Sequence, residues 1–63
     1  MTDSTSELFR IEDAARYLGC GRSTVYLLLD TGQLRSLHIG RLRRITRQEL
    51  ERFVHEREAA SAA

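Results

Sequence analysis

Two short clusters in this 63-residue chain carry side chains suited to gripping phosphate groups. The first combines one guanidinium with three hydroxyl groups and consists of Arg22, Ser23, Thr24 and Tyr26. The second is a run of arginines just after a glycine: Arg41, Arg43 and Arg44. A guanidinium holds a phosphate through two parallel hydrogen bonds, and a hydroxyl group donates to a phosphate or to a base edge. These clusters therefore indicate binding of a polyanion.

Charge is unevenly distributed along the chain, although the net charge is only +1. Residues 1–15 sum to −3, residues 16–47 to +6 and residues 48–63 to −2. The basic middle block holds seven arginines against one aspartate, and all ten basic residues of the chain are arginine. A basic block between acidic flanks is typical of a protein that binds nucleic acid.

The sequence lacks the residue patterns of a disulfide, a zinc site or a catalytic centre. The single cysteine, Cys20, excludes an intrachain disulfide and fits an apolar core position, and His38 and His55 stand apart without zinc-ligand or catalytic spacing. We therefore expect no enzyme, no metal, no cofactor and no small-molecule substrate. No apolar run reaches membrane-spanning length and the N-terminus is polar, so we expect a soluble, cytoplasmic protein without a membrane partner.

The spacing of apolar residues predicts two short helices joined by a tight turn. The first, over residues 11–18, follows the i, i+3, i+4, i+7 pattern of Ile11, Ala14, Ala15 and Leu18. Gly19 is expected to end it in a left-handed conformation. The second helix begins at Gly21 or Ser23 and ends at Thr31-Gly32. Its inward stripe is Val25, Leu28 and Leu29, which leaves Arg22, Ser23, Tyr26 and Leu27 facing outward.

Residues 35–45 predict a β-hairpin. Leu37 and Ile39 alternate with polar residues, so we expect both in the core. That expectation favours a three-residue tip at 40–42, which pairs Ile39 with Arg43 and Leu37 with Ile45 and lays the stem of Arg43 along Ile39. A two-residue tip at 40–41 would place Ile45 opposite residue 36, on the wrong face.

A third helix is predicted over residues roughly 47–57, with Leu50, Phe53 and Val54 as its apolar stripe. Thr46 and Glu49 have the spacing of a capping box, in which each side chain bonds the other residue's amide. Residues 1–7 and 58–63 are expected to be flexible tails around one domain, residues 8–57. The predicted fold is mainly α with a small β-hairpin: a winged helix-turn-helix, in which the hairpin is the wing.

The run from Glu12 to Val54 resembles the excisionase-type winged helix-turn-helix family, which is related to the DNA-binding domains of MerR-type regulators. The resemblance covers about residues 8–54. Its pieces are Ala14-Ala15, Leu18-Gly19, Arg22 to Tyr26, Gly32-Gln33-Leu34, Ile39-Gly40-Arg41 and Arg44-Ile45. The chain departs from the family's pattern at the two helix caps, where Arg10 and Gly21 replace Thr and Ser, and at Leu27, Asp30 and His38, where basic residues are common.

The resemblance implies binding of double-stranded DNA through the second helix and the wing. The candidate DNA-binding residues are Arg22, Ser23, Thr24, Tyr26 and Leu27 in the helix, and His38, Arg41, Arg43 and Arg44 in the wing. The implied role is that of an excisionase, a recombination directionality factor of a mobile element. Such a protein binds and bends DNA near an attachment site and favours excision by an integrase, which is a candidate partner.

Two alternatives remain open at this point. One is a small MerR-like transcription regulator on the same fold, and the other is a protein-interaction module that uses exposed Leu27 and Leu42 together with the acidic third helix. Leu27 and Leu42 are both suited to a thymine methyl group or to a neighbouring protomer, and partial burial against the wing is an equal alternative for Leu42. Because one helix and one wing offer little contact area, we expect a monomer that associates head to tail and cooperatively on DNA.

Overall fold

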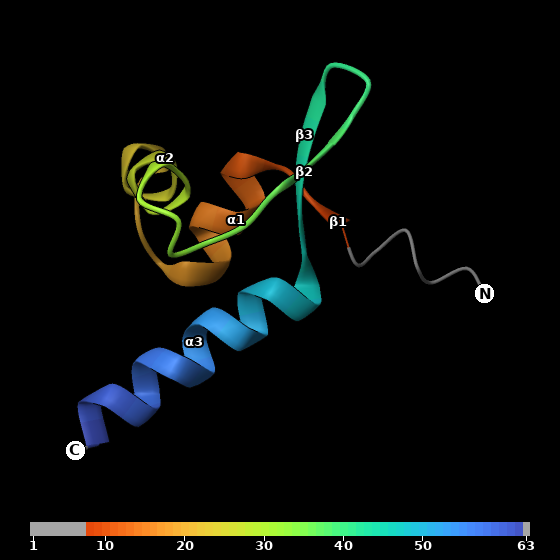
Figure 1. Ribbon diagram of the computed structural model, residues 1–63. Coiled ribbons are helices and arrows are strands. Elements are labelled where there is room, and N and C mark those ends of the chain that lie inside the picture. The colour runs from red at the N-terminus through yellow and green to blue at the C-terminus, as the bar shows by residue number, and fades with distance from the viewer. Residues whose placement is uncertain (1–7, 63) are drawn as a thin grey trace.

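The computed structural model describes residues 8–62, so the predicted N-terminal tail lies outside the described residues. The chain runs through six elements (Figure 1): β1 (Leu8–Phe9), α1 (Ile11–Leu18), α2 (Arg22–Asp30), β2 (Leu37–Ile39), β3 (Leu42–Thr46) and α3 (Arg47–Ala62). Three helices with a small antiparallel hairpin form a winged helix-turn-helix, which confirms the predicted fold class. Within residues 8–62, no helix is both long and apolar enough to cross a membrane.

The helix-turn-helix has the predicted limits. Gly19 ends α1 with φ +72°. The backbone N–H groups that follow the helix donate to carbonyls of its last turn, and the Cys20 N–H donates to the Ala15 carbonyl at 2.9 Å. Arg10 and Gly21 stand at the N-caps of α1 and α2, and neither helix receives a side-chain capping bond there. The expected weak caps are therefore confirmed, and packing must supply the stability that capping does not.

The core is built from α1, α2, β3 and α3, together with Leu34 between α2 and β2; Ala14 and Ala15 are the buried residues of α1. The side chains of Val25, Leu34, Ile45 and Leu50 are almost completely buried. The predicted inward stripe of α2 is confirmed, since Leu28 and Leu29 are also buried, while Leu27 is 59% exposed. Phe9, Ile11, Leu18, Cys20 and Phe53 pack against this cluster and are partly buried. The packing of Cys20 against the core agrees with the apolar position predicted for it.

The sheet has three strands in the order β1-β3-β2, and β1 was not predicted. Phe9 pairs with Ile45, so β3 is the central strand and continues into the hairpin on its other side. Two residues are too few to show an alternating pattern, and β1 forms only because the central strand offers it a free edge.

The predicted hairpin register is wrong. The observed pairs are Leu37 with Arg44, His38 with Arg43, and Ile39 with Leu42, which leaves a two-residue tip. The wing extends beyond the core, so Leu37 and Ile39 are exposed and burial does not select their register. A tip of this length requires positive φ, which Gly40 adopts at +63°.

The corrected register changes the place of two further residues. Ile45 and Leu37 now lie on opposite faces of the sheet, so Ile45 reaches the core without the rest of the hairpin. Arg43 does not lie along Ile39. Its Nε donates to Ser36 Oγ at 2.8 Å.

The start of α3 uses half of the predicted capping box. Thr46 Oγ1 accepts the Glu49 amide at 3.0 Å, but the Glu49 carboxylate does not return the contact. It accepts the Arg35 amide at 2.9 Å and hydrogen bonds from the Arg52 guanidinium, which also donates to the Gln33 carbonyl at 3.1 Å. These bonds fasten the segment between α2 and β2 to α3. The helix then continues through Ala62, so residues 58–62 are helical where a tail was expected.

The core packing of α2 leads to a stability prediction with an internal control. Leu28→Ala should lower the free energy of unfolding by roughly 2–5 kcal/mol, because it leaves a cavity between helices. Leu27→Ala removes the same atoms from an exposed position one residue earlier and should change stability by less than about 0.5 kcal/mol. Thermal melts of both variants measure this, and a larger loss for Leu27→Ala would mean that α2 is rotated relative to the core.

Glu49 gives the fold a pH dependence of defined sign. The hydrogen bond from Arg52 holds the pKa of this carboxyl below its ordinary value of 4.5, burial opposes that shift, and the Arg35 amide adds to it. A carboxyl with a lowered folded-state pKa stabilises the fold above its unfolded-state pKa. That contribution is lost as the pH falls through the folded-state pKa.

We therefore expect Glu49→Gln to melt at a lower temperature than the parent protein near pH 7, and to approach it at about pH 3. Melts at several pH values between these limits measure the gap. The exposed carboxylate of Glu51 provides the control, because Glu51→Gln should change melting little at either end. A gap for Glu49→Gln that stays constant as the pH falls would contradict this assignment.

Candidate nucleic-acid interface

A cleft of about 390 Å³ lies between the start of α1, the front of α2 and strand β3 of the wing. Figure 1 shows the hairpin standing away from the helical body, with α1 beside its base and α2 on the far side of α1. The cleft holds five arginines and one acidic residue, and its lining is Arg10, Ile11, Glu12, Arg22, Tyr26, Arg41, Leu42, Arg43 and Arg44. The fold therefore brings Arg22 and Tyr26 of the first cluster together with the three arginines of the second.

The predicted contacts of α2 lie on different rows of the helix. Arg22 and Tyr26 are one turn apart and both line the cleft. Ser23 and Leu27 form the next row and are exposed outside the cleft lining. Thr24 shares a row with the buried Leu28 and does not line the cleft. Arg22 and Tyr26 are thus the residues of α2 that face the wing.

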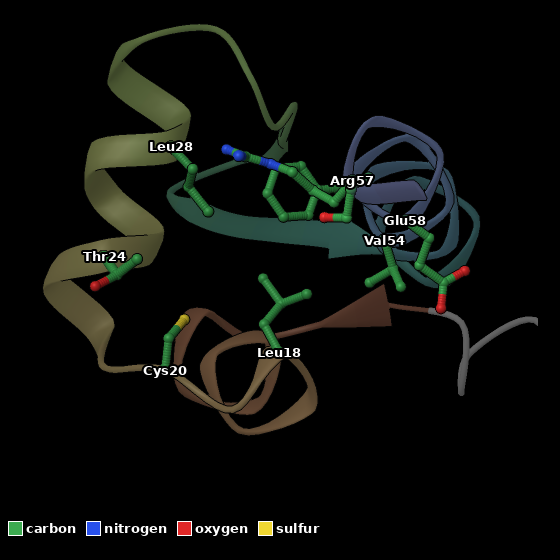
Figure 2. Close-up of a pocket in the computed structure, with 9 residues that line it drawn as sticks. Leu18, Cys20, Thr24, Leu28, Val54, Arg57 and Glu58 are labelled. Atoms are coloured by element: carbon green, nitrogen blue, oxygen red, sulfur yellow. The ribbon is translucent and has the colours of Figure 1, made fainter. Parts of the chain in front are cut away.

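Thr24 instead belongs to a second, mainly apolar groove of about 730 Å³ on another side of α2. Figure 2 shows Thr24 with Leu18, Cys20 and Leu28 around this groove, and Val54, Arg57 and Glu58 of α3 across from them. The groove opens where α3 leaves the helix-turn-helix. Thr24 therefore lines a different groove from Arg22 and Tyr26, and its contact with DNA stays a prediction.

Arg22 is oriented by an acidic neighbour that the sequence did not reveal. Its Nη1 lies 3.6 Å from Glu12 Oε2, and both side chains are largely exposed. An exposed pair contributes little to stability. It does place the Arg22 guanidinium beside Glu12 in the lining of the cleft, and a guanidinium is a group that can bind a phosphate or the edge of a guanine.

The arginines of the wing differ in exposure and in hydrogen bonding. Arg43 is half-buried and bonded to Ser36, and Arg44 is half-buried with its Nη1 donating to the Arg43 carbonyl at 2.9 Å. Arg41 is exposed in the two-residue tip. His38 lies opposite Arg43 in the ladder and is exposed, outside the cleft lining. Arg41 is therefore the wing residue best placed to reach a ligand beyond the protein surface.

Arg10 and Glu12 are the cleft residues missed from the sequence. Nothing in their spacing marks them, because only tertiary folding brings the start of α1 beside β3. The cleft has no metal-binding character either. Among residues 8–62 there is no group of three histidine, cysteine or acidic side chains placed to hold a metal ion.

Comparison with known proteins identifies the family of this chain. Residues 8–58 match the model of the helix-turn-helix domain family, so the chain belongs to that family. A curated protein from Saccharopolyspora erythraea, described as a probable excisionase, is 44% identical over 46 residues, which are 73% of this chain and 47% of that protein. The predicted resemblance to the excisionase-type family is thereby confirmed. This chain spans about half the length of that relative. No solved structure matches the chain significantly.

The position of Arg41 leads to a prediction about its mode of contact. If Arg41 meets phosphates rather than bases, Arg41→Ala should weaken binding to duplexes of different sequence by similar factors. It should also reduce the slope of log affinity against log salt by about one unit. Titrations over a salt series measure both. Arg16→Ala removes an exposed charge outside the cleft and should leave the slope unchanged. An unaltered affinity of Arg41→Ala for every duplex would exclude the contact.

Proposed function

We propose that this chain is a sequence-specific duplex DNA-binding protein that places α2 in a major groove and its wing on the adjacent backbone or minor groove. The observation that carries the proposal is the cleft, in which five arginines from α1, α2 and the wing converge. The second helix of a helix-turn-helix presents its N-terminal residues to base edges, and here those residues include Arg22. Membership of the helix-turn-helix family supports the same assignment.

The role we propose is that of an excisionase. It binds near a recombination site, bends the DNA and favours excision by an integrase. The support is the likeness to a protein described as a probable excisionase, together with a small cleft that is lined by five arginines. Proteins that bend DNA repay the deformation energy with the additional contacts that the bend permits.

Two assays in sequence test this proposal. Selection of bound duplexes from a random-sequence library should recover a shared motif, and Arg22→Ala should relax the motif at one position. The protein is then added, with the integrase of the same mobile element, to a plasmid that carries the motif beside two attachment sites. The expected result is more excised product, only with integrase present. Failure to select any duplex would refute DNA binding, whereas binding without any effect on excision would favour a transcription regulator.

We further propose that protomers associate on DNA although the free protein is a monomer. The wing carries Arg41, Arg43 and Arg44, while the outer part of α3 exposes Glu51 and Glu58. These surfaces are opposite in charge and lie on different elements. A contact between the wing of one protomer and α3 of the next is therefore heterologous and can repeat along adjacent sites.

Cooperativity on tandem sites tests this arrangement. The protein should sediment as a monomer without DNA and should fill two adjacent sites more readily than two independent ones. Glu51→Gln combined with Glu58→Gln should lower this cooperativity severalfold while leaving the affinity for a single site almost unchanged, since both residues lie outside the cleft. A stable dimer without DNA, or independent filling of the two sites, would contradict head-to-tail association.

A further inference from the structure

The tip of the wing carries an apolar pair that the core does not use. Ile39 and Leu42 lie directly opposite each other as the last pair of the ladder, with only Gly40 and Arg41 beyond them. Their exposed fractions are 48% and 52%. Opposite residues of an antiparallel ladder point to the same face, so the two side chains lie side by side and form one small apolar ridge.

Position and charge distinguish this ridge from an ordinary exposed patch. Leu42 also lines the cleft that contains Arg22 and Tyr26, so the ridge is continuous with the proposed DNA-binding surface. Arg41 adjoins it at the tip, and Arg43 and Arg44 follow it along β3. A surface that is apolar at its centre and carries guanidinium groups at its edge fits a partner with an apolar interior and an anionic border. Duplex DNA has that character, with stacked bases between two phosphate backbones.

We infer that Ile39 and Leu42 form a wedge that enters the minor groove and partly separates one base step, kinking the duplex. The inference rests on the proposed DNA binding and adds a mechanism for bending. Minor-groove proteins insert leucine, isoleucine and similar side chains between base pairs and kink the duplex by roughly 20–90° towards the major groove. The two-residue tip makes the ridge narrow, and the corrected register is what joins its two side chains.

The arginines supply the part of the binding energy that opens the step. Separating stacked bases costs a few kcal/mol per step, and contacts elsewhere must offset that cost. Phosphates on both sides of the groove lie within reach of a tip whose arginines adjoin the wedge. Pyrimidine–purine steps unstack most easily, so the step under the wing is expected to be TA or CA. Sequence preference would then arise at a position where the protein makes no base hydrogen bond.

The experiment uses a duplex selected by the wild-type protein, labelled at its ends with donor and acceptor dyes. A second copy carries 2-aminopurine at the TA or CA step beside the α2 site. At saturating protein, the wild type should shorten the end-to-end distance and raise the 2-aminopurine fluorescence at least twofold. Leu42→Ser should bind with less than a tenfold loss of affinity, yet lose at least half of the distance change and most of the fluorescence rise. The double variant Ile39→Ser with Leu42→Ser should lose more.

Leu37→Ser is the matched control, because Leu37 lies on the same face, is 41% exposed and pairs with Arg44 further from the tip. It should bend DNA like the wild type. The wedge is overturned if Leu42→Ser retains the full distance change and fluorescence, if Leu37→Ser loses as much, or if the wild type binds without bending. An absence of binding by the wild type overturns the proposed function and the wedge with it. Thermal melts establish that each variant is folded.

Discussion

The burial of Ile45 is the contact on which the arrangement of this small protein depends. Its side chain is fully buried in a core shared with Val25, Leu34 and Leu50. The same residue sits in the central strand, pairs with Phe9 on one side and lies at the root of the wing on the other. The following residue, Thr46, caps α3. One side chain thus fixes the positions of the sheet, the wing and the last helix relative to α2.

This constraint explains how a short chain keeps one surface free for binding. Only the root of the hairpin is anchored in the core, so β2 and the tip remain outside it and their side chains are available to a ligand. The anchoring also sets the direction of the wing beside α1 and α2. The polar bonds from Glu49 and Arg52 secure the segment that leads from α2 to the wing. These bonds hold the start of the segment that leads to the wing against α3.

The sequence was sufficient to locate the three helices because each has the core on one side, although it ended α3 near residue 57 and the helix continues to Ala62. The stripes of α1 and α2 show this directly, and Gly19 and Thr46 mark a helix end and a helix start. It was insufficient for the hairpin. Leu37 and Ile39 have the alternation of a half-buried strand, but their strand lies beyond the core, so the pattern predicted a register that burial does not enforce.

The candidate site could be predicted in the same partial way. Arg22, Tyr26 and the wing arginines are recognisable because they stand in local clusters with a basic surplus. Arg10 and Glu12 reach the cleft only through tertiary folding. Thr24 does not line the cleft, because it lies one turn before the buried Leu28 and on the same side of α2. The hydrogen bond from the Arg35 amide to Glu49 was missed for a related reason, since Arg35 is 14 positions away in the chain. Local spacing does not contain such information.

The central claim is that α2 and the wing bind one duplex together. Amide chemical shifts, recorded by NMR while a selected duplex is added, test it most directly because they report on every element at once. The account predicts large shifts for residues 22–27 and 40–44, with small shifts for the outer turns of α3. Shifts confined to α3 and the groove around Cys20, with the cleft residues unmoved, would contradict it.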